Sequence, residues 1–124
     1  MGIVHRAGIG SVRPIEYRSE PAGTWLLDVR EPDEWEAGHA PDAHHIPLGS
    51  LENHRFDLPV NRRIICICRS GGRSADATAT LGSWGFDAVN LEGGMQVWAA
   101  EGMPVVTDTG EDGTIISGNR SARI

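Results

Sequence analysis

The sequence predicts an α/β domain whose central sheet is mainly parallel and is flanked by helices on both faces. Short apolar runs of strand length alternate along the chain with segments of helical character. One of these runs, residues 63–67, is continuous and rich in β-branched side chains, which is typical of a strand buried on both faces. Parallel strands are joined by crossover helices, and these helices cover the two faces of the sheet.

The first half of the chain alternates short helices with short strands. A proline at the start of residues 14–18 suits the first turn of a helix. Residues 24–29 form an apolar run that predicts a buried strand. Residues 31–38 begin with acidic side chains and end at a glycine, which predicts a second short helix. Residues 44–48 predict a brief strand, and residues 50–59 predict a helical turn and a loop.

The second half of the chain carries the clearest elements. Residues 63–67 predict a strand, and the alanine- and threonine-rich residues 74–84 predict a helix that Gly85 terminates. Residues 88–91 predict a further short strand, and residues 94–100 predict a last helix. The alternation of strands and helices therefore continues to the end of the predicted domain.

At 124 residues the chain is long enough for one compact domain of ordinary size. We expect this domain to cover residues 1–106. From residue 107 onward the composition changes, so residues 107–124 predict a C-terminal tail. The tail is either disordered or attached to the surface through Ile115 and Ile116, and disorder is the simpler expectation.

The charge and hydropathy of the chain argue against some classes of partner. The chain has 11 basic and 17 acidic residues and a net charge of -6, which argues against nucleic acid as the main partner. No apolar run approaches the length of a membrane-spanning helix, and residues 1–10 do not resemble a signal peptide. We therefore expect a soluble, cytoplasmic protein without a membrane partner.

The two cysteines, Cys66 and Cys68, are separated by one residue. Side chains at i and i+2 of a strand point the same way, but their Cα atoms are about 7 Å apart, near the upper limit for a disulfide. The pair therefore predicts thiol chemistry in a reducing compartment rather than a disulfide framework. We expect Cys66 to be a small core residue; a role in resolving an intermediate on Cys68 is the alternative.

Cys68 directly follows the predicted strand 63–67 and comes shortly before the predicted helix 74–84. In parallel sheets, ligands bind beyond the carboxyl ends of the strands. Glycines in the intervening loop let successive N–H groups turn inward as a nest, and the partly positive N-terminus of the next helix points at the same place. These features, together with two nearby arginines, stabilise a thiolate. We therefore expect Cys68 to be an activated nucleophile.

Other polar residues have simpler interpretations. Asp28 and Arg30 lie at the end of a predicted strand, on the same edge as Cys68, and are expected to hold loops together as an ion pair. His39, His44 and His45 are close in sequence, but no cysteine or carboxylate spacing completes a familiar set of metal ligands. We therefore expect no metal and no cofactor.

Three motifs, in order along the chain, resemble those of the rhodanese-like sulfurtransferase family. Residues 68–74 resemble the active-site loop of the family. Residues 27–31, with 34–35 and 38–39, resemble its first signature, and residues 91–95, with Trp98 and 102–105, resemble its closing signature. The resemblance spans roughly residues 10–106 and implies the rhodanese-like α/β fold.

The resemblance implies an enzyme that transfers sulfur. Cys68 would accept a sulfane sulfur from a donor such as thiosulfate or a persulfide, and would become a persulfide itself. A thiol, cyanide or an acceptor protein would then remove the sulfur, and this two-step route implies ping-pong kinetics. The two arginines of the loop would favour anionic donors. The residues implied to bind the substrate are Arg69, Ser70, Gly71, Gly72 and Arg73.

Two alternatives stay open. A persulfide carrier or a sulfur-binding regulatory module that serves a partner protein needs the same loop, so the sequence does not separate it from an enzyme that uses small acceptors. A cysteine phosphatase or arsenate reductase uses a related but longer loop between cysteine and arginine than the four residues between Cys68 and Arg73. The short loop makes this second alternative the weaker one.

Overall fold

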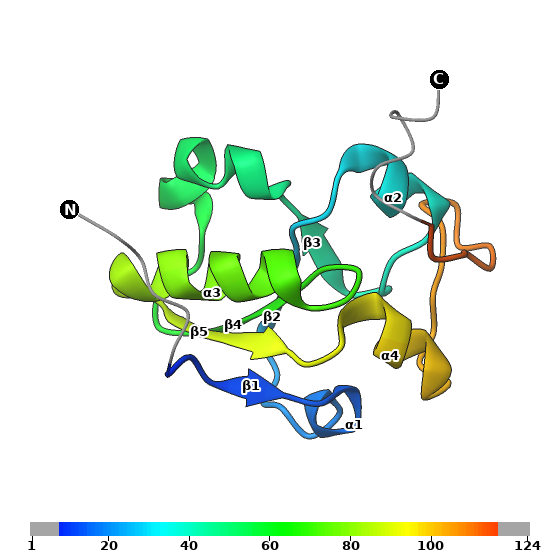
Figure 1. The fold of residues 1–124 in the computed structure, drawn as a ribbon, viewed down its shortest axis with the longest axis horizontal. Helices are drawn as coiled ribbons and strands as arrows, with labels where there is room; N and C mark the ends of the chain where they lie inside the picture. The colour runs from blue at the N-terminus through cyan, green and yellow to red at the C-terminus, as the bar shows by residue number, and fades with distance from the viewer. Residues whose placement is uncertain (1–7, 117–124) are drawn as a thin grey trace.

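The computed structural model of the chain describes residues 8–116 and is built around one parallel sheet (Figure 1). The sheet has five strands in the order β1-β5-β4-β2-β3, and each neighbouring pair is parallel. The strands are β1 (Ser11–Val12), β2 (Trp25–Asp28), β3 (Ala43–His45), β4 (Arg63–Ile67) and β5 (Asp87–Leu91). The α/β fold class that the sequence predicts is confirmed.

Helices cover both faces of the sheet (Figure 1). One face carries α3 (Gly72–Ser83) and the 3-10 helices η1 (Leu48–Ser50) and η2 (Glu52–Asp57), with one of the two apolar core clusters beneath them. On the other face lie α1 (Pro14–Tyr17) and α4 (Gly94–Ala100). The remaining helix, α2 (Pro32–Ala37), directly follows the carboxyl end of β2.

Alternate residues of β4 explain why this strand has no polar face. Ile64 and Cys66 belong to the cluster under α3, whereas Ile65 and Ile67 belong to the cluster under α4, and all four are fully buried. A strand covered on both faces needs apolar side chains at every position, because successive side chains point to opposite sides of the sheet. The continuous apolar run at 64–67 in the sequence reflects this burial on both faces.

The structure differs from the sequence prediction at some element boundaries. β1 was not expected from the sequence; it has two residues and pairs with β5 through Ser11–Asn90 and Val12–Leu91. The helix expected over residues 74–84 begins at Gly72, because the backbone already turns helical within the loop. The strand expected over residues 44–48 is Ala43–His45, and the chain turns into η1 after Pro47.

Residues 107–116 return to the end of α2. The Thr114 amide donates to the Ala37 carbonyl at 2.8 Å, and His39 and Val106 form an antiparallel bridge. A Cβ at Gly38 would lie 2.6 Å from the Thr114 nitrogen, so only glycine allows this approach. Ile115 packs against the core cluster under α4. This segment of the predicted tail is therefore attached, while residues 117–124 and 1–7 lie outside the described residues; the domain boundary at residue 106 stays a prediction.

Within residues 8–116, no helix is both long and apolar enough to cross a membrane.

Candidate functional site

Cys68 lies at the carboxyl end of β4, one residue beyond the strand. Its side chain is 1% exposed and belongs to the apolar cluster under α3. The next strand of the sheet, β2, ends beside it, since the Val29 amide donates to the Ile67 carbonyl at 3.0 Å. The predicted nucleophile is thus at the edge of the sheet where α/β proteins bind their ligands.

Three hydrogen-bond donors converge on the Cys68 sulfur. The backbone amide of Gly71 lies 3.1 Å from Sγ, and the amide and hydroxyl of Ser74 each lie 3.3 Å from it. The hydroxyl is also 3.3 Å from the Gly71 carbonyl, so its single proton is donated either to the sulfur or to this oxygen. Ser74 is in the first turn of α3, whose free N–H groups carry the positive end of the helix dipole. All three donors, and the helix dipole, stabilise negative charge on sulfur. The site can therefore hold a thiolate.

Gly71, whose amide donates to the sulfur, is held in place through its backbone conformation and its carbonyl. Gly71 has a φ of +111°, a left-handed conformation that favours glycine, and it caps α3. Its carbonyl accepts hydrogen bonds from the Ala75 amide at 3.1 Å and from the Asn90 side chain on β5 at 3.3 Å. These contacts anchor the residue whose amide donates to the sulfur.

The start of α4 supports the beginning of the loop. The Met95 amide donates to the Cys68 carbonyl at 2.7 Å, and the Gln96 amide donates to the Arg69 carbonyl at 2.9 Å. Gly94 has a φ of +61°, and a Cβ there would lie 2.4 Å from the Cys68 carbonyl oxygen. The position of Cys68 therefore depends on a glycine more than twenty residues further along the chain.

Arg73 points to α2 and forms an ion pair with Glu34. Its two terminal nitrogens lie 2.6 Å and 2.9 Å from the two carboxylate oxygens, and the Glu34 side chain is fully buried. Burial would raise the pKa of the Glu34 carboxyl, but hydrogen bonds from Arg73 and the Glu31 amide outweigh it and lower the pKa. The same hydrogen bond to Glu34 raises the pKa of Arg73, and this effect is larger than the opposite effect of partial burial, which lowers it.

The other predicted loop residues differ in exposure. Ser70 and Gly72 are exposed, while Gly71 and Arg69 are half-buried. Arg69 forms no ion pair with the acidic residues that the structure describes, and its Nε is buried without a hydrogen-bond partner. Of the amides in the loop, those of Gly71 and Ser74 reach the sulfur.

Cys66 lies inside the core, on the same side of β4 as Cys68. Both cysteines are free. Burial raises the pKa of the Cys66 thiol to about 12, so the thiol stays protonated and unreactive at neutral pH. These properties agree with the predicted core role for Cys66 and give no support to a resolving role.

The predicted ion pair of Asp28 and Arg30 is confirmed. Both side chains are fully buried, with Arg30 Nη2 2.7 Å from Asp28 Oδ2 and 2.8 Å from the Gly38 carbonyl. The pair ties the end of β2 to the end of α2, since Gly38 follows this helix. It therefore helps to place Glu34, and through Glu34 it helps to place Arg73.

The histidines near α2 make aromatic and hydrogen-bond contacts. The Trp35 ring is stacked between the rings of His39 and His45, with centroid distances of 3.5 Å and 4.8 Å. His39 Nε2 also lies 2.9 Å from the Asp108 carboxylate, and His45 Nε2 lies 2.7 Å from the Arg30 carbonyl. In the part of the chain that the structure describes, no three side chains of histidine, cysteine or acidic type are grouped to hold a metal.

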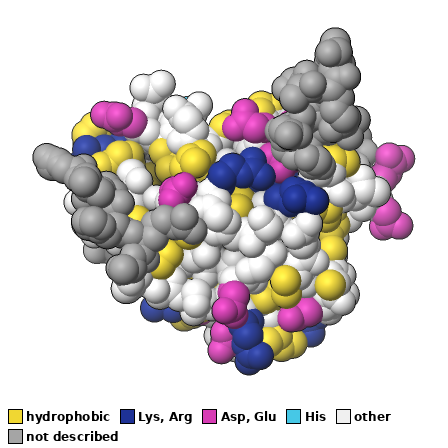
Figure 2. Space-filling view, viewed as in Figure 1, with side chains coloured by type: hydrophobic (Ala, Val, Ile, Leu, Met, Phe, Trp, Pro, Cys, Tyr) yellow, Lys and Arg dark blue, Asp and Glu magenta, His cyan; other side chains and the backbone are white. Residues whose placement is uncertain are grey.

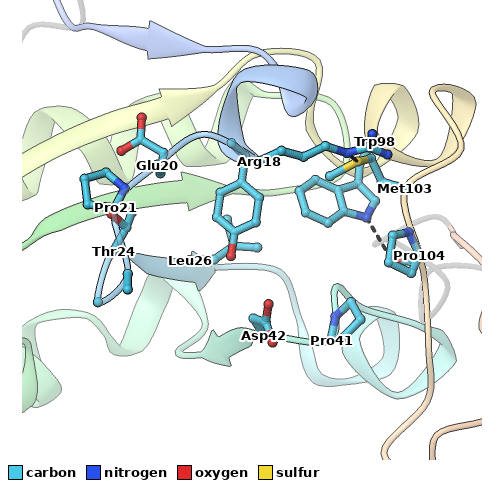
Figure 3. A pocket seen from close by; sticks show the side chains of 13 residues that line it. Arg18, Glu20, Pro21, Thr24, Leu26, Pro41, Asp42, Trp98, Met103 and Pro104 are labelled. Atoms are coloured by element: carbon cyan, nitrogen blue, oxygen red, sulfur yellow. Dashed lines mark hydrogen bonds between the residues drawn. The ribbon is translucent and has the colours of Figure 1, made fainter.

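A groove of about 520 Å³ lies away from the loop, between α1, the start of β2 and the turn before β3. Figure 3 shows Leu26 at its floor, with Trp98 and Met103 on one side and Asp42 on another. Arg18 Nε reaches the Met103 sulfur at 3.2 Å. None of the residues that line the groove belongs to residues 68–74. This groove is therefore separate from the candidate site.

The face of the molecule that carries α3 is mixed in charge (Figure 2). Basic side chains lie together near the middle of this face, with acidic side chains beside them and uncharged surface below. The strongly acidic character of the whole chain, with its net charge of -6, is therefore absent from the centre of this face.

Three residues that position the site are not predicted from the sequence, and Ser74 is predicted only as the last residue of the loop motif and the start of the helix. Glu34, Asn90 and Gly94 lie far from Cys68 in the chain and reach the loop through the fold. Glu34 and Gly94 do fall within the first and the closing motif, so membership of these motifs is the sequence feature that could have indicated their roles. For Asn90, the only indication in the sequence is weaker: it is a polar residue near the end of an apolar strand.

Comparisons with known proteins identify the family of the chain. The family model described as "Rhodanese-like domain" matches residues 15–101. A sulfurtransferase from Allochromatium vinosum is 38% identical over 86 residues, which cover 68% of this chain and 80% of the relative. A putative sulfur carrier protein from Bacillus subtilis is 43% identical over 77 residues, or 61% of this chain and 42% of the relative. The crystal structure of a rhodanese-related protein from Thermoplasma volcanium is 33% identical, with a TM-score of 0.75 over 80% of this chain and 99% of that one. The chain belongs to the rhodanese-like domain family.

Proposed function

We propose that the protein is a sulfurtransferase that carries the transferred sulfur as a persulfide on Cys68. The observation that carries this proposal is the convergence of the Gly71 amide and of the Ser74 amide and hydroxyl on the Cys68 sulfur. Membership of the rhodanese-like family supports sulfur transfer in general, as do relatives named as a sulfurtransferase and as a putative sulfur carrier. The donor and the acceptor are part of the proposal.

In the first step, the Cys68 thiolate attacks the outer sulfur of a donor such as thiosulfate. A bond forms between the two sulfurs, the S–S bond of thiosulfate breaks, and sulfite leaves with the electron pair of that bond. The product is a persulfide anion on Cys68. The Gly71 and Ser74 donors and the N-terminus of α3 stabilise negative charge at this position. The loop residues Arg69 to Arg73 surround the added sulfur.

In the second step, a thiolate or cyanide attacks the terminal sulfur of the persulfide. The S–S bond on Cys68 breaks, and the electron pair returns to the Cys68 sulfur, which regenerates the thiolate. No net oxidation or reduction of the protein takes place over the two steps. Because the donor product leaves before the acceptor reacts, the kinetics are of the ping-pong type.

A carrier that delivers its sulfur to one partner protein is the second candidate. The observation that favours it is the likeness to the putative sulfur carrier protein of Bacillus subtilis, of which this chain covers 42%. A relative from Mycobacterium tuberculosis is named as a probable adenylyltransferase/sulfurtransferase, and this chain covers 21% of it. Both candidates share the first step and differ in the acceptor.

Intact mass spectrometry after incubation with thiosulfate tests the shared step. We expect the protein to gain one sulfur atom that cyanide removes. The gain should persist in Cys66→Ser, the matched control in the core, and should vanish in Cys68→Ser. A gain in Cys68→Ser, or no gain in any variant with either thiosulfate or a small persulfide, would overturn the proposal. Faster discharge by a protein acceptor than by cyanide or small thiols would favour the carrier.

A further inference from the structure

Glu34 and Arg73 form an ion pair at the rim of the candidate site. The negative charge of Glu34 therefore lowers the net positive charge near a bound sulfur donor. We infer that Glu34 determines donor specificity: its carboxylate compensates Arg73 and so reduces the preference of the site for doubly charged donors over singly charged ones. The inference rests on the proposed sulfur transfer and specifies which donors the same site accepts.

Glu34 holds Arg73 too firmly for the guanidinium to turn to a donor. Both carboxylate oxygens bind Arg73, at 2.6 Å and 2.9 Å, and one of them also accepts the Glu31 amide at 2.9 Å. The Glu34 side chain is fully buried, whereas that of Arg73 is 31% exposed. If Arg73 moved away, it would leave a carboxylate buried without a partner, which is strongly unfavourable. The pair therefore persists when a donor binds.

Arg69 is the second guanidinium of the loop, and its situation differs. None of the carboxylates that the structure describes pairs with it, and its Nε is buried without a partner. The loop thus offers one uncompensated positive charge, although its sequence contains two arginines. Coulomb attraction is proportional to the charge of the donor, so compensation of Arg73 weakens the binding of a dianion more than that of a monoanion.

Thiosulfate and methanethiosulfonate are a matched pair of donors for the test. Each transfers its terminal sulfur to the Cys68 thiolate and releases an oxyanion of sulfur, sulfite or methanesulfinate, with the electron pair of the broken S–S bond. Thiosulfate carries two negative charges, and methanethiosulfonate carries one. We would measure kcat/KM for each donor at low ionic strength, with cyanide as the acceptor, in the wild type and in Glu34→Gln.

The control variant is Glu36→Gln. Glu36 is exposed on the same helix as Glu34, so this variant changes the net charge of the chain equally without removing the partner of Arg73. For Glu34→Gln we expect kcat/KM to rise about fivefold with thiosulfate and about twofold with methanethiosulfonate. The ratio of the two values should stay unchanged in Glu36→Gln.

The double variant Glu34→Gln/Arg73→Gln separates charge from structural support. It removes both members of the pair, so the donor ratio should return toward the wild-type value. An equal change for both donors in Glu34→Gln, or a ratio that stays raised in the double variant, would overturn the inference. If Glu34→Gln does not fold, Arg73→Gln gives the opposite test: it leaves the carboxylate uncompensated and should lower the ratio, and an unchanged ratio would overturn the inference.

The activity of the wild type with the two donors distinguishes a failure of this inference from a failure of the proposed function. If the wild type turns over neither donor, sulfur transfer from these donors fails, and the inference fails with it. If the wild type turns over both donors and the ratio is insensitive to Glu34, the inference alone is wrong.

Discussion

Replacing Gly94 by alanine would place a methyl group against the backbone that carries Cys68. The added Cβ would lie 2.4 Å from the Cys68 carbonyl oxygen and 2.7 Å from the carbonyl carbon of Arg69. Backbone atoms cannot move aside as the end of a flexible side chain can, so the loop and α4 must separate. The Met95 and Gln96 amides, which donate to these two carbonyls, would move with α4.

The cost follows from two separate effects. Gly94 has a φ of +61°, and an alanine in this left-handed region costs about 1 kcal/mol. Forcing a methyl group into closely packed surroundings adds about 2 kcal/mol. The free energy of unfolding should therefore fall by about 3 kcal/mol, a large part of the stability of a domain of this size. A shift of the nucleophile by about 1 Å should also slow persulfide formation by about 100-fold.

Two control glycines separate the cost of the left-handed backbone conformation from the cost of the steric clash of the added methyl group. Gly85 has a φ of +95° and open space around its Cβ position, so Gly85→Ala should cost about 1 kcal/mol for conformation alone. Gly82 is exposed in α3 with no atom near its Cβ position, so alanine there should stabilise the protein by about 0.5–1 kcal/mol. Urea unfolding and the rate of persulfide formation would be measured for all three variants. If Gly94→Ala behaved like Gly85→Ala in both assays, the support of the loop by α4 would be refuted.

Three further predictions concern single side chains. Ser74→Ala removes one donor to the Cys68 sulfur and should slow persulfide formation about fivefold, a loss of about 1 kcal/mol; Ser83→Ala, at the exposed end of the same helix, should not change the rate. Because burial raises the pKa of Cys66 from 9.0 to about 12, the protein should lose about 1 kcal/mol of unfolding free energy between pH 7 and pH 10, since only the unfolded thiol ionises there. The loss should shrink in Cys66→Ala, and equal losses would contradict the assignment. Glu34 has a lowered pKa in the folded state, so it stabilises the fold above its unfolded pKa of about 4.3, and this contribution disappears as the pH falls through the lower folded value. Glu34→Gln should therefore lose less stability than the wild type from pH 5 to pH 3 in acid unfolding, and identical curves would count against the prediction.

The sequence predicted the middle of the fold better than its edges. Residues 64–67 include no charged position, and the structure buries both sides of β4 there. β1 is two residues long, which is too short for any periodicity, and it becomes a strand only because β5 lies beside it. The glycine at the end of α2 was predicted, but its close contact with residues 105–114 was not, because these residues approach Gly38 only in the folded chain.

The site could be predicted as a loop but not as a set of contacts. The order of strand, cysteine, glycines and helix is local, and it indicated both the nest and the helix N-terminus around Cys68. The direction of the Arg73 side chain is not local, because it depends on where α2 packs and on the buried carboxylate of Glu34. The roles of Asn90 and Gly94 likewise arise from β5 and α4, which meet the loop only after folding.

The pairing of the strands also constrains how the chain reaches this fold. β1 and β5 are neighbours in the sheet, although most of the domain lies between them in the sequence. No two of the described strands are joined by a hairpin, so every pairing must close a long loop before it contributes stability. We expect β4, α3 and β5, which are consecutive, to assemble first and β1 to dock last. During synthesis, β1 leaves the ribosome long before its partner strand, and the edge of β5 stays open to other chains until β1 covers it.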